Sequence, residues 1–156
     1  MFSTRAIFQA TLVAIALTSC SKDPQKAKVE YFLSGEQFVR GGKLSEGIIQ
    51  FRNALKQDPQ YGEARLALAH ALRKSGDASS AYREYLHAAE MLPTNARAQI
   101  EAGWIKLAVG EFQEAKTLAE KAIALESRNV EAHILEGSAL SGLKQFDAAV
   151  AEVEAA

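Results

Sequence analysis

The stretch GEARLALAHALRKSGDASSAYREYLHAAEMLPTN, residues 62–95, contains the pattern that decides the fold. Apolar residues recur in it at helical spacing in two groups: Leu66, Ala69 and Leu72, then Ala81, Tyr85 and Ala88. Between the groups, Ser75-Gly76-Asp77 is a turn signal that ends one helix and begins the next. The stretch therefore predicts two amphipathic helices joined by a short turn.

The same pattern recurs every 34 residues along the chain. Small residues hold equivalent positions in successive units: Gly35, Ala69, Gly103 and Gly137; Gly47, Ala81, Ala115 and Ala149; Ala54, Ala88, Ala122 and Ala156. Small residues are expected where two helices cross, because a larger side chain would push the backbones apart. Pro59 and Pro93, also 34 positions apart, are expected to end the second helix of their units. Since no unit can bury its apolar face alone, the units should stack into a solenoid.

This period, with its small residues and prolines, resembles the tetratricopeptide repeat. The resemblance covers residues 28–156, with units that begin at Lys28, Gly62, Ala96 and Val130, the last of them incomplete. It implies an all-α protein, a right-handed α-solenoid of stacked helix-turn-helix repeats. The family's aromatic positions are held by Tyr31, Phe38, Phe51 and Tyr85. Four residues depart from the family pattern and are expected to weaken single contacts: Arg65, Gln99 and His133 at the fourth position, and Lys106 at the eleventh.

The amino-terminal residues follow a different rule. Arg5 precedes an apolar run of about 12 residues, typical of a secretory signal and shorter than the roughly 20 residues of a membrane-spanning helix. Leu17-Thr18-Ser19-Cys20 resembles a bacterial lipobox, in which the cysteine is acylated and becomes the first residue of the mature chain. We therefore predict a signal peptide over 1–19, a polar tether over 20–27 and the solenoid over 28–156. The alternative is that Cys20 is an ordinary residue of a conventionally cleaved signal.

Lipid on Cys20 would hold the solenoid at a membrane of the bacterial cell envelope, facing the periplasm. The lipoprotein resemblance also implies the outer membrane, because Ser21 rather than aspartate follows the cysteine. Cys20 is the single cysteine, so no intrachain disulfide can form.

The charge balance argues against nucleic acid as a partner. The chain has 18 basic and 19 acidic residues, and removal of residues 1–19 takes away only Arg5, which leaves 17 against 19, a net charge of −2. Nucleic-acid-binding domains carry a basic patch or stripe instead.

In this family, a concave surface lined by set positions of each first helix binds other proteins. Carried onto this sequence, those positions and the adjoining rim predict a peptide-binding groove formed by Phe32, Glu36, Leu66, His70, Arg73, Lys74, Ile100, Trp104, Leu107 and Ile134. The apolar members favour a helix or an extended apolar segment of another protein as ligand, with Trp104 as the main anchor. The alternative is that Phe32, Leu66, Ile100 and Ile134 pack between neighbouring helices.

No motif in the chain points to catalysis. Glu84 and His87 form a Glu-x-x-His pair, but the second copy and the inward-facing glutamates of a paired-metal bundle site are missing, so both are expected to point to solvent. The sequence contains neither a glycine-rich phosphate loop nor a nucleophile elbow. We therefore expect no enzyme activity, no metal site and no cofactor.

The lipobox, the repeats and the segment GIIQFRNAL, residues 47–55, together resemble exported bacterial repeat lipoproteins of exopolysaccharide and exosortase systems. The resemblance implies a membrane-tethered periplasmic scaffold that supports envelope or exopolysaccharide-export assembly. The alternatives are a secretion or assembly chaperone and a noncatalytic repeat segment of a larger enzyme. Because Ala156 falls inside a second helix before any cap, we expect the chain to be the first part of a longer protein, or to cover this end with a partner.

Overall fold

The structure, a computed structural model, describes residues 23–155, and the regular structure in this part of the chain is entirely helical. The helices are α1 (Pro24–Arg40), α2 (Leu44–Gln57), α3 (Gly62–Ser75), α4 (Ala78–Met91), α5 (Ala96–Ala108), α6 (Phe112–Leu125), α7 (Val130–Gly142) and α8 (Phe146–Ala155). They form consecutive hairpins, here called units 1 to 4: α1 with α2, α3 with α4, α5 with α6, and α7 with α8. The predicted all-α class is confirmed.

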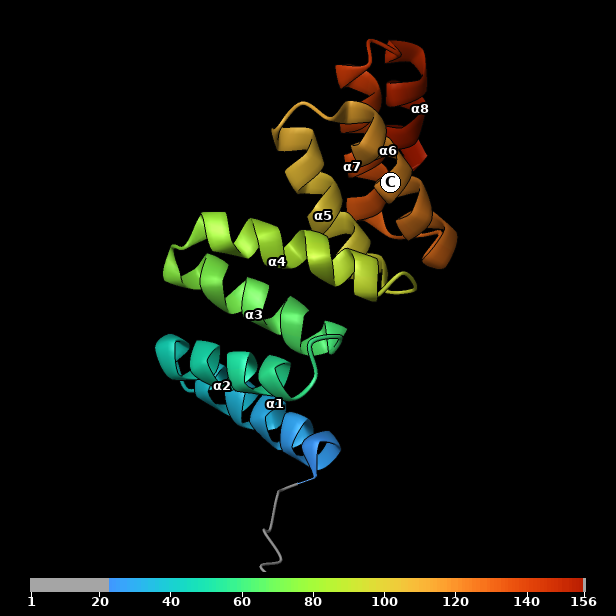
Figure 1. The fold of residues 1–156 in the computed structure, drawn as a ribbon. Coiled ribbons are helices and arrows are strands. Elements are labelled where there is room, and N and C mark those ends of the chain that lie inside the picture. Colours follow the sequence, from blue (N-terminus) through green and yellow to red (C-terminus); the bar gives the residue numbers. More distant parts are fainter. Residues whose placement is uncertain (1–22, 156) are drawn as a thin grey trace, which may run out of the picture.

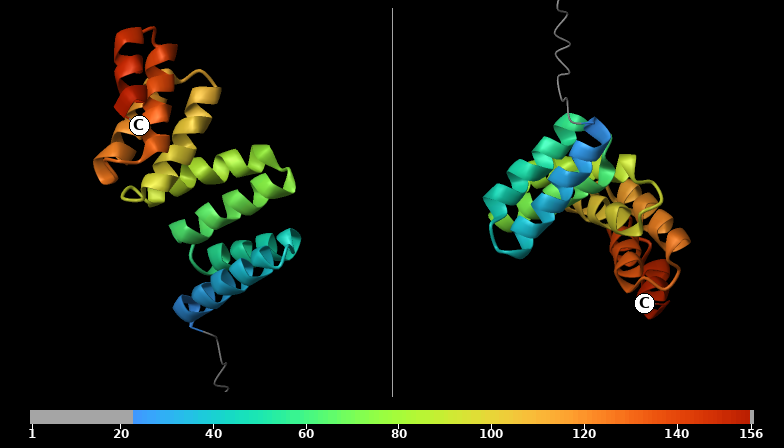
Figure 2. Two further views of the ribbon diagram at one scale, coloured as in Figure 1. Left: turned by 180° about the vertical axis from the view of Figure 1, so that it is seen from behind. Right: turned by 90° about the horizontal axis from the view of Figure 1, so that it is seen from below.

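The hairpins stack beside one another into an elongated solenoid, as predicted (Figure 1). Within each unit the two helices pack along their lengths, and the second helix of one unit packs on the first helix of the next. The stack is not straight, because units 3 and 4 turn away from the direction of units 1 and 2 (Figure 2). The α4–α5 boundary is less extensive than the α2–α3 and α6–α7 boundaries, and α3 contacts α5 less than α5 contacts α7.

Caps and turns account for the helix ends. Four side chains accept hydrogen bonds from backbone N–H groups in the first turn: Asp23 from Gln25, Asp77 from Ser80, Asn95 from Ala98, and Asn129 from Ala132. Gly76 follows α3 in the left-handed region, with φ of 91°, which glycine adopts without strain. Pro59 and Pro93 lie just beyond the ends of α2 and α4, as predicted.

The start of α1 differs from the prediction. The helix begins at Pro24, so residues 24–27 are helical and do not belong to the tether expected over 20–27. Asp23 caps it by accepting the Gln25 N–H at 3.0 Å, and proline suits the first helical position because the N–H it lacks has no partner there. The signal peptide and Cys20 lie outside the described residues and stay predictions. No helix within residues 23–155 is long and apolar enough to cross a membrane.

The small residues of the period lie where helices approach most closely. Ala54, Ala88 and Ala122 have no exposed surface. A Cβ atom added to Gly47 would lie 2.6 Å from Val39 Cγ2 and 3.2 Å from the carbonyl oxygen of Gly35. The crossing of α1 and α2 therefore requires glycine at position 47.

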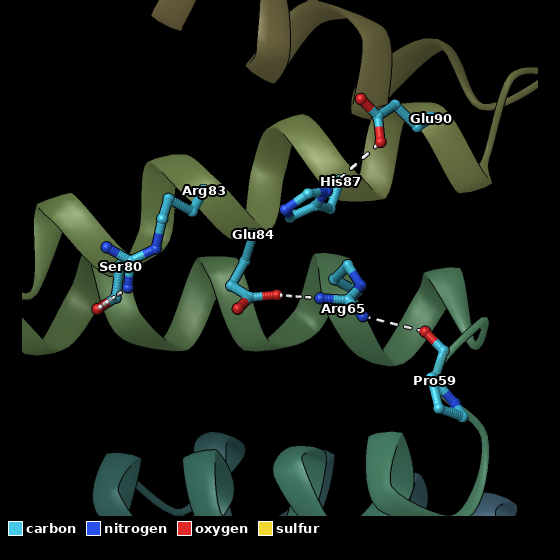
Figure 3. A network of polar contacts seen from close by, with 7 residues as sticks. All are labelled: Pro59, Arg65, Ser80, Arg83, Glu84, His87 and Glu90. Carbon is cyan, nitrogen blue, oxygen red and sulfur yellow. Dashed lines mark hydrogen bonds and ion pairs between the residues drawn. The ribbon is translucent and has the colours of Figure 1, made fainter.

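The fourth-position residues join each unit to the turn before it. Each reaches a carbonyl oxygen of that turn: Arg65 reaches Pro59 at 3.0 Å, Gln99 reaches Leu92 at 3.1 Å, and His133 reaches Ser127 at 3.0 Å. Each also bonds to a second helix: Arg65 to Glu84 at 2.7 Å, Gln99 to the Ala89 carbonyl at 2.9 Å, and His133 to Glu152 at 2.9 Å (Figure 3 shows the Arg65 contacts). The three side chains therefore have specific hydrogen-bond partners, although Arg65 Nε is buried without one, and the expectation of weaker contacts stays a prediction.

Candidate functional site

Two hollows indent the face that the first helices build. The larger, of about 720 Å³, lies between units 2 and 3 and extends to the start of α7. The smaller, of about 250 Å³, lies mainly between α1 and α3. Arg73 and Arg97 line both hollows, so the two meet there. We call the joined hollows the groove.

Six of the ten residues predicted to form a peptide-binding groove line these hollows. Glu36, His70 and Lys74 line the smaller hollow, Ile100 and Trp104 line the larger, and Arg73 lines both. Ile100 is only 2% exposed, so it forms part of the floor. Trp104 is half-buried, and its Nε1 donates a hydrogen bond to Glu131 Oε1 at 3.2 Å, which fixes the indole against the start of α7.

The other four predicted residues lie elsewhere. The ring of Phe32 contacts the rings of Phe51 and Tyr61, with centroids 6.0 and 5.4 Å apart. Leu66 packs on the buried clusters at the unit 1–2 and unit 2–3 boundaries, and Leu107 packs on the cluster between units 3 and 4. Ile134 is 41% exposed but lines neither hollow. The alternative considered for Phe32, Leu66, Ile100 and Ile134 was packing between helices, which describes Phe32 and Leu66 and also Ile100, a member of the buried cluster between units 3 and 4.

His70 lies under the basic part of the groove as a neutral group. Burial lowers its pKa to about 4, and the nearby charges of Arg97, Arg73 and Lys74 act in the same direction. The imidazole is therefore uncharged at pH 7 and adds nothing to the positive charge around it.

Tyr85 and Glu101 complete this buried region. Burial, and then the charge of Glu101, raises the pKa of Tyr85 to about 12, so its hydroxyl keeps its proton. The hydroxyl oxygen lies 2.8 Å from His70 Nδ1, and the two groups form a hydrogen bond. Burial also raises the pKa of Glu101, while the charge of Arg73, 3.6 Å away, opposes that shift.

The comparison with known families rests on most of the solenoid. Residues 32–96 and 100–156 match a family model described as tetratricopeptide repeat. The chain belongs to the tetratricopeptide repeat family. Its fold is therefore that of a protein-interaction scaffold, and the resemblance seen in the sequence is confirmed at this level.

Solved tetratricopeptide repeat structures share the fold at low sequence identity. MamA from Desulfovibrio magneticus RS-1 is 18% identical, with a TM-score of 0.70 over 83% of this chain and 73% of that one. YrrB, described as a TPR protein with an unusual peptide-binding site, is 18% identical, with a TM-score of 0.69 over 84% and 68%. The first TPR of Spaghetti (RPAP3), bound to HSP90 peptide SRMEEVD, is 21% identical, with a TM-score of 0.60 over 81% and 94%. No curated protein sequence matches this tetratricopeptide repeat chain.

The prediction from the sequence missed nine of the twelve residues that line the larger hollow, and four of them show why. Arg97 and Glu131 occupy the second position of units 3 and 4, one of the concave positions of the tetratricopeptide repeat, so the family pattern contained the signal for both. Tyr82, in α4, and Glu126, after α6, also line the hollow. Tyr82 belongs to a second helix and Glu126 to the turn between units 3 and 4, positions outside the first helices on which the prediction was based.

The Glu-x-x-His pair of this tetratricopeptide repeat protein has structural partners. Glu84 is half-buried and forms an ion pair with Arg65, so the expectation that it points to solvent was wrong. His87 is exposed as expected, and its Nδ1 lies 3.4 Å from Glu90 (Figure 3). Within residues 23–155 no group of three His, Cys, Asp or Glu side chains could hold a metal ion.

Proposed function

We propose that this protein is a membrane-tethered scaffold of the bacterial cell envelope that binds a segment of another protein in its groove. The observation that supports the proposal most is the groove itself, a hollow of about 720 Å³ with the indole of Trp104 on its wall. Large aromatic residues in such hollows dominate the energetics of many interfaces. YrrB and the first TPR of Spaghetti, described with a peptide-binding site and a bound peptide, favour the same use of the fold.

Photo-crosslinking tests the groove. A photoreactive amino acid in place of Trp104 should crosslink discrete proteins from envelope fractions, whereas the same amino acid in place of Ile49 should not. Ile49 is a matched control, because it is a 54% exposed apolar residue on α2 outside both hollows. Equal crosslinking from both positions would contradict binding in the groove.

The tether is proposed to be lipid on Cys20, which would place the scaffold on the periplasmic side of the envelope, with the outer membrane favoured by Ser21. Several buried acyl chains give stable anchoring, because each buried methylene contributes about 0.8 kcal/mol. We expect Cys20→Ser to move the protein from the detergent-rich to the aqueous phase of a detergent partition and to abolish labelling by fatty acid. Ser21→Ala is the control and should stay lipidated.

The proposed pathway is support for envelope or exopolysaccharide-export assembly. Support for it is the combination of the lipobox-like segment with repeats that begin eight residues later, at Lys28. We expect the partners crosslinked at position 104 to belong to export or envelope machinery. Identification of those partners by mass spectrometry, against the Ile49 control, tests this; cytoplasmic partners alone would contradict it.

A further inference from the structure

The charged residues that line the groove are separated by sign. Around α1, α3 and the start of α5 the lining cations outnumber the anions: Arg40, Arg73, Lys74 and Arg97 against Glu36 and Glu101. Where α6 gives way to α7, the charged lining residues are Glu126 and Glu131, both acidic. The groove therefore has a basic end and an acidic end, although the chain as a whole is nearly neutral.

The positive charge of the basic end is only partly neutralised internally, since Arg40 lies 3.9 Å from Glu36 and Arg73 lies near Glu101. Lys74 and Arg97 form no ion pair with any residue in the described range, 23–155. Arg73 keeps 53% of its side chain exposed, and its guanidinium lies 3.6 Å from Glu101, a loose contact. Burial, and then the charges of Arg97, Arg73 and Lys74, lowers the pKa of the neighbouring His70, so that its imidazole adds no charge to this end.

The negative charge of the acidic end is equally available. Glu126 Oε2 accepts a hydrogen bond from Asn129 Nδ2 at 2.7 Å, and Glu131 Oε1 accepts one from Trp104 Nε1 at 3.2 Å. Both donors are neutral, and neither carboxylate forms an ion pair in the part of the chain that the structure describes. These hydrogen bonds orient the carboxylates while leaving their charge for a ligand.

The distance between Arg97 and Trp104 along α5 sets the distance between the ligand groups that would contact them. Arg97 and Trp104 are seven residues apart on one helix and line the same hollow. At a rise of 1.5 Å per residue they lie roughly 10 Å apart along the axis. An extended peptide covers that distance in about three residues. Glu131 touches the indole of Trp104, so its partner on the ligand would directly follow the group that covers the indole.

We propose that the groove selects an extended peptide segment with an acidic residue, an apolar residue about three positions away, and a basic residue adjoining the apolar one. The acidic side chain lies at Arg97 and Lys74, the apolar side chain covers Trp104, and the basic side chain lies at Glu131. This inference rests on the proposed function, since it names the ligand chemistry of the same groove. Because the two ends of the groove carry opposite charges, they favour such a segment. They disfavour a segment with two acidic or two basic residues at these positions.

Titration with short blocked peptides of equal length tests the proposal. One peptide has the acidic, apolar and basic pattern, and three others replace the end charges by two acidic, two basic or two uncharged residues. Trp104 is the only tryptophan of the chain, so its emission reports binding directly. We expect the mixed-charge peptide to bind most tightly, with each reversed end weakening affinity about three- to tenfold at low ionic strength. That advantage should shrink as salt is added.

Charge reversal in the protein should redirect the preference. Arg97→Glu is expected to favour the peptide with two basic ends, and Glu131→Lys the peptide with two acidic ends. Both side chains are exposed, and Arg52→Glu, an exposed change on α2 outside the groove, should leave the order unchanged. Helical circular dichroism verifies each fold; if a variant fails to fold, the wild-type titrations alone decide.

Two outcomes would overturn the inference, and they are distinguishable. Equal binding of all four peptides by the wild-type protein would overturn the charge pattern and leave the proposed function standing. Binding of none of them, at concentrations where the protein stays folded, would overturn the groove as a peptide site and the charge pattern with it.

Discussion

Single buried polar side chains control how the units are joined. Gln99 is only 2% exposed, and its Nε2 donates to the carbonyl oxygens of Ala89 and Leu92. Those carbonyls lie in the last turn of α4 and just beyond it, where backbone acceptors have no partner within the helix. Gln99 satisfies them without a capping glycine, which explains why an amide is placed inside an otherwise apolar boundary.

Gln99→Glu should therefore destabilise the protein at neutral pH. A carboxylate of the same shape cannot donate to a carbonyl, so we expect a loss of about 3 kcal/mol in the free energy of unfolding. Part of the loss should return near pH 5, as the buried carboxyl takes up a proton and becomes a donor. Urea unfolding at both pH values measures the effect, with the exposed Gln113→Glu as control. A loss independent of pH would contradict the donor role.

His70 should make stability depend on pH. The pKa of His70 is about 4 in the folded protein and near the ordinary value of 6.5 in the unfolded chain, so the unfolded chain binds the extra proton between these values. The contribution of His70 to the free energy of unfolding is complete above about pH 6.5. It falls by up to about 3 kcal/mol as the pH falls towards 4. His133 acts oppositely: its bond to Glu152 raises its pKa, so its contribution is lost as pH rises through the folded value.

Replacement of His70 tests its contribution to the pH dependence of stability. His70→Gln keeps a hydrogen-bond partner for the Tyr85 hydroxyl and removes the titrating group, so the drop in stability between pH 6.5 and 4 should become smaller than in the wild type. His87→Gln, at an exposed position of α4, should keep the wild-type drop. Thermal unfolding across this pH range decides the point, and parallel curves for His70→Gln and the wild type would refute the role given to His70.

At the scale of the helices, most of the fold could be predicted from the repeat period. Small residues, turn signals and prolines mark nearly every helix end, because each reports a local backbone requirement. The start of α1 was missed because the signals there, Asp23 and Pro24, precede the repeat register. The joining role of Arg65 was also missed, since its partners, Pro59 and Glu84, are set by the packing of neighbouring helices and not by local sequence.

The crossing of α1 and α2 provides a test at this scale. Gly47→Ala raises helix propensity by roughly 1 kcal/mol, yet the added Cβ would lie 3.2 Å from a backbone oxygen that cannot rotate away. We expect a net loss of about 1 to 2 kcal/mol, because overpacking outweighs the propensity gain. Glu46→Ala, exposed on the same helix, is the control for propensity. Increased stability of Gly47→Ala in chemical denaturation would show that the helices can separate without cost.

At the scale of the whole molecule, the bend between units 2 and 3 is what the sequence did not reveal. The period is uniform, so it predicts equal boundaries, whereas the α4–α5 boundary is the least extensive of the three. The larger hollow lies at this bend, and Tyr82 and Glu126, which are outside the first helices, also line it. The predicted Ile100 and Trp104 line it because both belong to α5, the first helix beyond the bend.

Because the α4–α5 boundary is limited, units 1 and 2 should be able to unfold separately from units 3 and 4 once it is weakened. Ala98 has no exposed surface and packs with Ala89 and Ala102 at the α4–α5 boundary. We expect Ala98→Leu to overpack it, to cost about 1 to 3 kcal/mol, and to separate unfolding into two steps. Trp104 emission follows units 3 and 4, while circular dichroism follows all units. Ala64→Leu, at the equivalent position of the more extensive α2–α3 boundary, should unfold in one step. Coincident transitions in Ala98→Leu would contradict this division.

The fourth-position contacts also limit how the chain could be rebuilt. Arg65 requires a carboxylate on α4, Gln99 requires two backbone acceptors, and His133 requires Glu152. The partners Glu84 and Glu152 lie in the same hairpin as Arg65 and His133, whereas all three side chains also reach a backbone carbonyl of the preceding unit or turn. Grafting or reordering individual hairpins, a routine strategy for designed arrays of identical repeats, would in this protein require a backbone carbonyl at each new junction within reach of the fourth-position side chain.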